Sequence, residues 1–251
     1  MDKLLIKKRF SRRLGGYRSH AIVQREMAVK LLENLESFAG TSRFARIFEI
    51  GCGAGILSEK IAAALDYDNL ILNDIVSDCD GLVDRIPRAA FLAADVESLQ
   101  SLPGPFDLII SNAVVQWLSE PEKLFDGALA ALNPGGVFAF SSFAPDNMRE
   151  VRELTGAGLP YTEPEQLETW GNARFAKVEV FTRQTILKFE DPLDVLRHLR
   201  DTGVNAVKAP PFWNRRRLQE FRNSYESRFG RAGRVPLSYS PLYFYARKEM
   251  K

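Results

Sequence analysis

The sequence predicts an α/β fold built on a mostly parallel sheet that carries helices on both of its faces. From about residue 45, short apolar runs typical of buried strands alternate with longer stretches of helical periodicity. A glycine-rich turn over 51–55 lies between the first of these runs and a helix. Because parallel strands are joined by right-handed crossovers, residues that bind a ligand are expected at the carboxyl ends of the strands.

The first half of the chain is expected to contain five strands and two helices. The strands are predicted at 45–50, 70–73, 89–93, 106–111 and 137–141, and the helices at 56–65 and 120–132. Pro121 suits the first turn of the second helix, where the N–H that proline lacks would have no partner. The segment Asn-Pro-Gly-Gly at 133–136 is expected to end this helix before the fifth strand.

After residue 143 the pattern becomes mainly helical. Helices are predicted at 147–154, 163–175, 191–201 and 214–229, a long strand at 178–189 and a final strand at 240–247. Asp191 as N-cap, Pro192 and Gly203 support the third of these helices. We therefore predict one domain over 1–251, with a basic helical cover at 1–40, a core sheet at 45–189 and 240–248, and a helical lid at 191–235 inserted between the last two strands.

The composition excludes several classes of protein. Of the residues, 45% are hydrophobic and 26% are charged, which argues against a disordered, collagen-like or coiled-coil chain. No apolar run approaches the roughly 18 residues that span a bilayer. Cys52 and Cys79 form no Cys-x-x-Cys pair and the chain has 2 histidines, so we expect neither a disulfide framework nor a metal site. The basic start lacks the apolar segment of a secretory signal, so we expect a cytoplasmic protein.

The net charge of +2 hides an uneven distribution along the chain. Residues 1–20 carry a net charge of +6 and residues 197–251 a net charge of +9, which leaves −13 on residues 21–196. If the two basic ends meet in space, they form a positive surface that would steer an acidic partner. The alternative is that both ends are simply solvated.

The strongest local signal is the run Glu49-Ile50-Gly51-Cys52-Gly53-Ala54-Gly55 between the first strand and its helix. Glycines there let the backbone turn sharply and approach a ligand closely. The dinucleotide-binding pattern is Gly-x-Gly-x-x-Gly, whereas here the third glycine comes one residue earlier. The anionic Glu49 would repel phosphate and attract a sulfonium or amino group, which favours a nucleoside ligand without a pyrophosphate.

Three further signals follow at the ends of the next strands. Asp74 ends the second strand, where a carboxylate can accept hydrogen bonds from both ribose hydroxyls. Asp95-Val96 follows the third strand and is placed to meet an adenine amino group, and Ser111-Asn112 ends the fourth strand beside the ligand. Asp74 could equally be a turn residue and Asp95 a helix cap, but four such signals in order argue against coincidence.

This ordered set of residues over about 45–145 resembles the class I S-adenosylmethionine-dependent methyltransferases. The resemblance implies a Rossmann-like sheet of seven strands in the order 3-2-1-4-5-7-6, with the last pair antiparallel. It implies S-adenosyl-L-methionine as cofactor, with Glu49 and the glycines at its methionine end, Asp74 at its ribose and Asp95 at its adenine. The expected cofactor-binding residues are Glu49, Gly51, Cys52, Gly53, Gly55, Asp74, Ile75, Asp95, Val96 and Asn112.

The flanking segments narrow the resemblance to the malonyl-[acyl-carrier protein] O-methyltransferases of biotin synthesis. The motifs that carry it are Phe10-Ser11-Arg12-Arg13 with Tyr17-Arg18-Ser19-His20-Ala21 and Gln24, Asn112 to Trp117 after the fourth strand, and Thr202-Gly203-Val204-Asn205. This resemblance spans nearly the whole chain. One departure is Asn73, because the family more often has an apolar residue before the acidic Asp74.

The resemblance implies methylation of the free malonyl carboxylate, which primes pimeloyl synthesis. This carboxylate is ionised at pH 7, since carboxyl pKa values lie near ~4, so no general base is needed. Catalysis would come from alignment and exclusion of water. Tyr17 and His20 would close over the methionine end or contact the substrate, Trp117 would line the acyl pocket, and Asn205 would orient the thioester.

The expected partner is the strongly acidic acyl-carrier protein carrying malonyl, with malonyl-CoA as the alternative carrier. Its dock would be the basic C-terminal segment, mainly Arg215, Arg216, Arg217 and Arg222. The arginine that pairs with the malonyl carboxylate cannot be chosen from the sequence. We expect a monomer that binds neither nucleic acid nor membrane. The alternatives are a methyltransferase for RNA or another small carboxylic acid, and a non-methylating assembly factor of the same fold.

Overall fold

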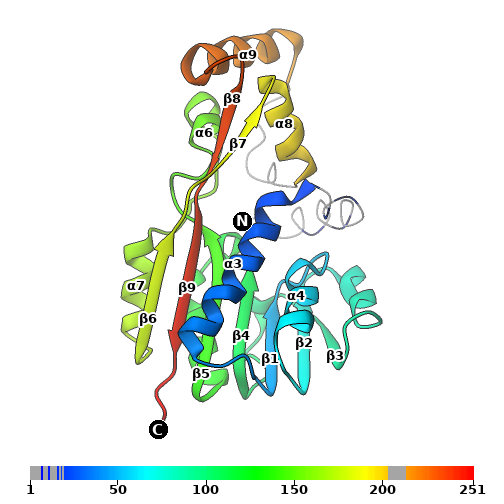
Figure 1. The fold of residues 1–251 in the computed structure, drawn as a ribbon, viewed down its shortest axis with the longest axis vertical. Coiled ribbons are helices and arrows are strands. Elements are labelled where there is room, and N and C mark those ends of the chain that lie inside the picture. The colour runs from blue at the N-terminus through cyan, green and yellow to red at the C-terminus, as the bar shows by residue number, and fades with distance from the viewer. Residues whose placement is uncertain (1–6, 8–10, 12–15, 17, 19, 203–212) are drawn as a thin grey trace.

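A computed structural model describes residues 7, 11, 16, 18, 20–202 and 213–251 of the chain. Its centre is a seven-stranded sheet in the order β3-β2-β1-β4-β5-β9-β6 (Figure 1). The strands are β1 (Arg46–Ile50), β2 (Asn69–Asp74), β3 (Ala89–Ala93), β4 (Phe106–Asn112), β5 (Leu132–Phe143), β6 (Lys177–Thr182) and β9 (Pro241–Arg247). Strands β1 to β5 pair in parallel, and β9 pairs antiparallel with both β5 and β6. This confirms the predicted order, with β9 in the place of the seventh strand.

Alternating side chains divide the interior into two layers, one on each face of the sheet. In β5, Val137 and Ala139 join one cluster of buried residues, whereas Phe138 and Phe140 join the other. Successive residues of a strand point to opposite faces, so this alternation requires helices on both sides. Helices α3 (Ile22–Ala39) and α4 (Ile56–Ala64) cover one face, and α5 (Pro121–Ala131) and α7 (Pro164–Asn172) cover the other.

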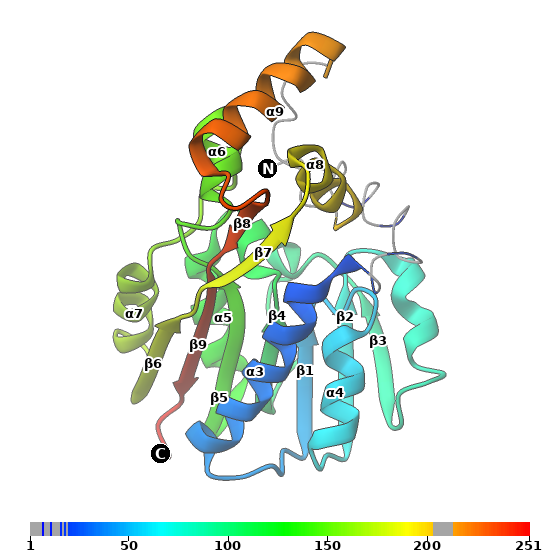
Figure 2. The same cartoon turned by 45° about the horizontal axis from the view of Figure 1, so that its top comes forward.

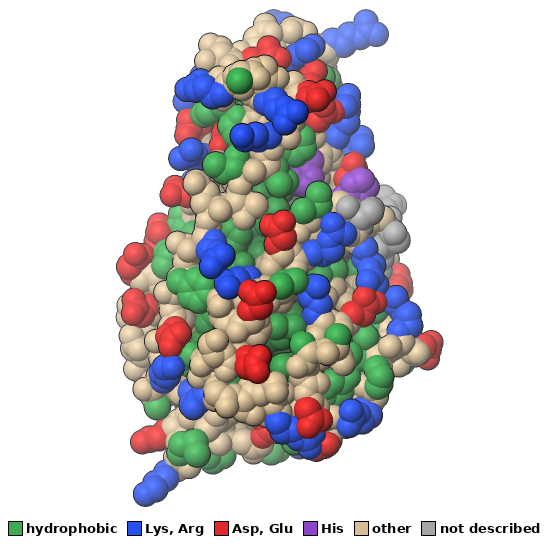
Figure 3. All heavy atoms as spheres, in the orientation of Figure 1, with side chains coloured by type: hydrophobic (Ala, Val, Ile, Leu, Met, Phe, Trp, Pro, Cys, Tyr) green, Lys and Arg blue, Asp and Glu red, His purple; other side chains and the backbone are tan. Residues whose placement is uncertain are grey.

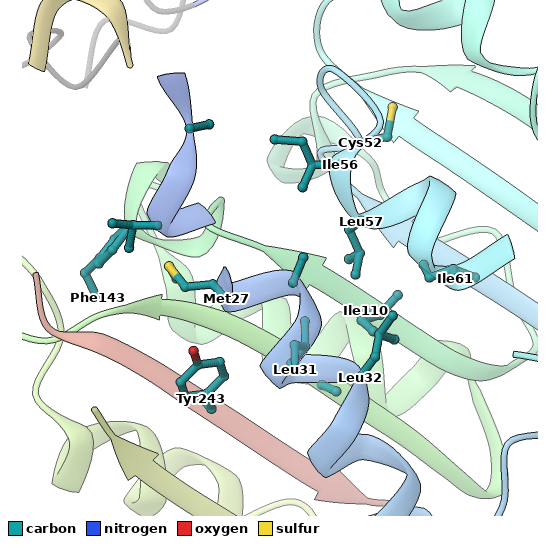
Figure 4. Close-up of a cluster of buried hydrophobic side chains, with 14 of the residues drawn as sticks. Met27, Leu31, Leu32, Cys52, Ile56, Leu57, Ile61, Ile110, Phe143 and Tyr243 are labelled. Carbon is teal, nitrogen blue, oxygen red and sulfur yellow. The ribbon is translucent and has the colours of Figure 1, made fainter. Parts of the chain in front are cut away.

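Helix α3 fixes the N-terminal part of the chain against the sheet. Its buried side chains Met27, Leu31 and Leu32 recur at helical spacing. In Figure 4, Leu32 lies beside Ile110 of β4, whereas Met27 points toward Phe143. The helix ends at a glycine in the left-handed conformation, Gly40, whose φ is 70°. The predicted basic cover at 1–40 is therefore, in its described part, an amphipathic helix packed on the core.

The predicted long strand at 178–189 is wrong. Strand β6 ends at Thr182. Residues 185–189 form a separate strand, β7 (Thr185–Phe189), which pairs with β8 (Val235–Tyr239) in a two-stranded sheet. Together with α6 (Arg149–Thr155), α8 (Pro192–Asp201) and α9 (Arg215–Phe229), this two-stranded sheet forms an arm beyond the main sheet (Figure 2). The alternating pattern continues through the break, so the sequence does not reveal the change of partner.

Two smaller differences concern the ends of elements. Strand β5 begins at Leu132 and not at 137, because Leu132 pairs with Phe106 and an irregularity follows before Leu108. The lid predicted at 191–235 includes Val235, which is the first residue of β8. None of the helices in the described ranges is long and apolar enough to cross a membrane.

Candidate active site

A pocket lies at the carboxyl ends of the parallel strands. One wall comes from the ends of β1, β2, β3 and β4, and the other from the end of β5, the start of α6 and the end of α8. Among the residues predicted to bind a cofactor, those that line this pocket are Glu49, Gly51, Cys52, Gly53, Asp74, Ile75, Asp95, Val96 and Asn112. The predicted ligand-binding edge of the sheet is therefore also the edge at which the pocket lies.

The glycine-rich turn leaves no room for side chains. Gly51, Gly53 and Gly55 all have positive φ, and a Cβ on Gly51 would lie 2.4 Å from a methyl group of Val114. Gly55 does not line the pocket; its φ is 80° and a Cβ there would lie 2.5 Å from Leu82. Gly55 is therefore explained by the turn into α4, and its predicted ligand contact is not needed to account for it.

Glu49 lies in the pocket wall as a buried carboxyl group. Its residue is 1% exposed, and its Oε2 has no hydrogen-bond partner among the described residues. Burial, together with the nearby charge of Asp74, raises the pKa of Glu49 to about 8. A buried carboxyl group of this kind gains most from a ligand that brings a positive charge.

Asp74 connects the glycine turn to the end of β2. Its Oδ2 accepts a hydrogen bond from the N–H of Gly53 at 2.9 Å, and its Oδ1 accepts one from the N–H of Val76 at 2.8 Å. Burial raises the pKa of Asp74, and the backbone N–H groups and the charge of Lys7 oppose this shift. Lys7 lines the pocket as well, and no motif marks it apart from the basic run in which it lies.

Asn73 explains the departure noted in the sequence. Its Nδ2 donates hydrogen bonds to the carbonyl oxygens of Leu92 at 3.0 Å and Ala94 at 2.9 Å. These contacts hold the loop that leads to Asp95, whose Oδ1 in turn accepts from the N–H of Glu97 at 3.1 Å. The polar residue before Asp74 is therefore a brace between β2 and the loop after β3.

Asn112 ties β4 to its neighbours. Its Nδ2 donates to the carbonyl of Gln24 in α3 at 3.1 Å, and its Oδ1 accepts from the hydroxyl of Ser141 at 2.6 Å. Gln24 also lines the pocket, is 4% exposed and leaves its Oε1 without a partner in the described part of the chain. In the part of the chain that the structure describes, Oε1 of Gln24 and Oε2 of Glu49 are therefore buried polar atoms of the pocket wall without a hydrogen-bond partner.

The two cysteines lie beside each other, although 26 residues separate them in the chain. Cys52, Cys79 and Asp74 each place a ligand-type atom within 4.8 Å of the others, and all three residues are buried. A hydrogen bond to Cys79, burial, and the charges of Glu49 and Asp74 raise the pKa of the Cys52 thiol. The thiol is therefore held in its protonated form, which is not the form that binds metal ions.

The predicted substrate residues have different outcomes. Trp117 lines the pocket, half-buried, beside Gln116. His20 is exposed and does not line the pocket; it lies near the only other histidine, His198, whose pKa it lowers together with burial. Tyr17 and Asn205 lie outside the described residues.

Sequence reasoning missed several residues of the outer wall. Phe143, Met148, Leu159 and Tyr161 all line the pocket, and so does Thr202 of the motif that begins at 202. The polar member of this set that faces a buried network is Tyr161, whose hydroxyl lies 2.8 Å from Nδ2 of Asn147. Phe143, Met148, Leu159 and Tyr161 come from segments that only the fold brings together, so no local motif marks them.

The arginines predicted to bind a partner lie on α9, at the far end of the arm. Arg215, Arg216 and Arg217 are exposed in the first turn of the helix, a region where Lys and Arg side chains gather (Figure 3). Arg222 is partly committed to ion pairs, at 3.1 Å from Asp191 and 3.3 Å from Glu226. A helix N-terminus disfavours positive charge, and the ion pair of Arg216 with Glu220 at 3.4 Å offsets this in part.

The chain matches known proteins along nearly its whole length. A family model described as a methyltransferase domain matches residues 20–208. The malonyl-[acyl-carrier protein] O-methyltransferase of Chlorobium phaeovibrioides is 38% identical over 98% of this chain and 97% of its own length. The proteins of the same name from Bacteroides thetaiotaomicron and Haemophilus influenzae are 37% and 34% identical, over 99% and 98% of this chain and 99% and 95% of their own lengths.

Solved structures share the fold at low sequence identity. The YcgJ protein of Bacillus subtilis has a TM-score of 0.62 and 13% identity, covering 88% of this chain and 98% of its own. The N-methyltransferase NodS of Bradyrhizobium japonicum, solved with S-adenosyl-L-homocysteine, has a TM-score of 0.54 and 18% identity, covering 93% and 98%. At these identities the likeness concerns the fold alone.

Proposed function

The chain belongs to the family of malonyl-[acyl-carrier protein] O-methyltransferases, and on that premise we propose that it methylates the free carboxylate of malonyl-acyl-carrier protein. The product is the methyl ester that starts pimeloyl synthesis for biotin. The observation that carries this function is the 38% identity to a malonyl-[acyl-carrier protein] O-methyltransferase over 98% of the chain. The pocket at the ends of the parallel strands supports it, because its residues suit a cationic nucleoside.

S-adenosyl-L-methionine is the methyl donor, and the described residues fit it. The unpartnered Oε2 of Glu49 suits the positively charged methionine end, and Gly51 and Gly53 keep the turn free of side chains around it. We assign Asp74 to the ribose hydroxyls, since its carboxylate lines the pocket and is oriented by the N–H groups of Gly53 and Val76. Asp95 and Val96 are assigned to the adenine, on the loop that Asn73 braces.

The chain's own residues have a limited chemical task in this reaction. The malonyl carboxylate is already ionised at neutral pH, so no residue has to remove a proton. When bound, S-adenosyl-L-methionine supplies the methyl group. The pocket residues align the carboxylate and keep water out, and the apolar side chains of Trp117, Phe143 and Met148 suit the second task.

We assign the docking of the acyl-carrier protein to the first turn of α9. Arg215, Arg216 and Arg217 are exposed there, and an acidic partner adds favourable charge at a helix N-terminus where Arg216 forms an ion pair with Glu220 at 3.4 Å. Reversing these three charges is expected to raise KM for malonyl-acyl-carrier protein about tenfold or more, and to leave KM for malonyl-CoA nearly unchanged.

A matched control reverses three exposed lysines elsewhere, Lys123, Lys177 and Lys251, which changes the net charge equally. The docking assignment would be rejected if the α9 variant raised KM equally for malonyl-acyl-carrier protein and malonyl-CoA. It would also be rejected if the α9 variant and the lysine control raised KM for the carrier protein equally.

The experiment that tests the function is intact-mass spectrometry of malonyl-acyl-carrier protein after incubation with the protein and S-adenosyl-L-methionine. A gain of about 14 Da that ester hydrolysis removes is expected from carboxyl methylation. If the mass does not increase although calorimetry shows cofactor binding in the same sample, malonyl-acyl-carrier protein is not the acceptor and another acceptor must be sought.

A further inference from the structure

The acceptor half of the pocket raises the question of which group holds the substrate's carboxylate. Among the described residues, Lys7 is the cationic side chain that lines the pocket, and its charge acts on Asp74 at the cofactor side. Gln116, Trp117, Phe143, Met148, Leu159, Tyr161 and Thr202, which line the acceptor half, are uncharged. Among the described residues, a carboxylate that enters this half therefore meets neutral hydrogen-bond donors.

The buried network behind Tyr161 fixes the direction of its hydroxyl. The N–H of Ser240 donates to Oδ1 of Asn147 at 3.1 Å, and a backbone N–H has no other role than donor. Asn147 is 1% exposed, so its amide orientation is set by this contact and its Nδ2 must face Tyr161. Nδ2 then donates to the Tyr161 oxygen at 2.8 Å.

A hydroxyl that accepts from Asn147 retains its own proton for another acceptor. Within the described part of the chain, Asn147 is the hydrogen-bond partner of this hydroxyl, and no protein acceptor takes its proton. Burial raises the pKa of Tyr161 to about 12, so the group stays protonated at neutral pH and does not act as a base. The ring lies edge-on to Phe143, 6.2 Å between centroids, in the pocket wall.

We propose that Tyr161 donates a hydrogen bond to the malonyl carboxylate, and that Asn147 is the positioning residue that turns its proton into the pocket. The contact would hold the oxygen that does not attack, leaving the other oxygen for the methyl group. A neutral donor suits this role because the product ester is uncharged, so no unpaired cation remains buried after transfer. This inference rests on the proposed function.

The test uses steady-state kinetics with malonyl-CoA and malonyl-acyl-carrier protein. Tyr161→Phe removes only the hydroxyl and is expected to raise KM for both substrates about tenfold or more, with the affinity for S-adenosyl-L-methionine changed less than twofold. Wild-type turnover is measured first, because its absence would refute the proposed function and not this inference. An unchanged KM in Tyr161→Phe, beside an active wild type, would overturn the inference.

Asn147→Asp separates positioning from simple packing. The aspartate still accepts from Ser240, but its second oxygen cannot donate, so Tyr161 would turn its proton toward residue 147 and away from the substrate. KM is expected to rise as in Tyr161→Phe. The KM of the double variant is expected to lie within twofold of the higher KM of the two single variants. Fully multiplicative effects would overturn the positioning role.

Acetyl-CoA, which has the thioester but no carboxylate, tests which oxygen is bound. Its inhibition constant is expected to be equal for wild type and Tyr161→Phe. A weaker inhibition of the variant would move the contact to the thioester carbonyl and overturn the assignment to the carboxylate.

Discussion

Binding of S-adenosyl-L-methionine is expected to tighten strongly as the pH rises from 6 to 8, because of Glu49. In the ligand-free protein, burial and the charge of Asp74 raise the pKa of this carboxyl group to about 8. The group is then mostly protonated at neutral pH, whereas a ligand with a positive charge beside it favours the carboxylate form. Binding must therefore expel a proton from Glu49 at pH 7.

The magnitude follows from the fraction of protein that is ready to bind. If only the ionised form binds tightly, the apparent Kd scales with the inverse of the ionised fraction. For a pKa of about 8 this fraction is about 1% at pH 6, about 9% at pH 7 and one half at pH 8. The apparent affinity should rise about ninefold from pH 6 to pH 7 and about fivefold more to pH 8.

Isothermal titration calorimetry measures both parts of this expectation. Titrations at pH 7 in two buffers of different ionisation enthalpy should report the release of about one proton for each ligand bound. Glu49→Gln should bind more weakly and with no pH dependence over the same range. An affinity that is constant between pH 6 and pH 8, with no proton release, would refute the reasoning.

The same shift has a consequence for stability with a definite sign. The pKa of Glu49 in the folded protein lies above its ordinary value of 4.5, so its contribution to stability is complete below pH 4.5 and is lost as the pH rises through about 8. The ligand-free Glu49→Gln protein should therefore melt at a higher temperature than the wild type at pH 8, and the difference should shrink toward pH 5. A wild type that melts higher than this variant at pH 8 would show that Glu49 is charged and stabilised in the folded state.

Three further changes test other parts of the structure. Asp74→Ala is expected to weaken binding of S-adenosyl-L-methionine at least about tenfold, and unchanged affinity by calorimetry would reject its ribose role. Asn73→Leu leaves the carbonyls of Leu92 and Ala94 without their donor, so it should cost about 1–3 kcal/mol of unfolding free energy in urea and weaken cofactor binding; no change in either would remove the brace. Phe125→Ala empties the centre of an aromatic cluster and should cost about 3–5 kcal/mol, with a loss below about 1 kcal/mol contradicting the packing.

The main sheet could be predicted from the sequence because its signals are local. Each parallel strand is an apolar run followed by a turn and a helix, so the positions of Glu49, Asp74 and Asp95 at strand ends follow from the pattern alone. The strand order came from the resemblance to a family, since periodicity does not name the partner of a strand. The same limit explains the error at 178–189, where the alternation is continuous and only the pairing changes, from β9 to β8.

The outer half of the pocket could not be predicted, because its contacts join segments that are distant in the chain. Asn147 and Ser240 are 93 positions apart, and the hydrogen bond between them decides the role proposed for Tyr161. The proximity of Cys52 and Cys79 was missed for the same reason, since the spacing of two cysteines says nothing about contact through the turn after β2. Sequence reasoning finds residues that share a strand end, and it does not find residues that share only a cavity.

The places where this chain departs from the rules of stability indicate where its ligands bind. A buried carboxyl oxygen without a partner in the described part of the chain, as at Oε2 of Glu49, costs free energy in the ligand-free protein. Positive charge in the first turn of α9 also costs free energy, which the ion pair of Arg216 with Glu220 offsets in part. A cationic cofactor relieves the first cost and an acidic partner relieves the second. If both costs are relieved by binding, the two ligands should stabilise the folded protein by separate amounts. Thermal shifts with S-adenosyl-L-methionine should then depend on pH and hardly on salt, whereas shifts with malonyl-acyl-carrier protein should fall as salt screens the exposed arginines.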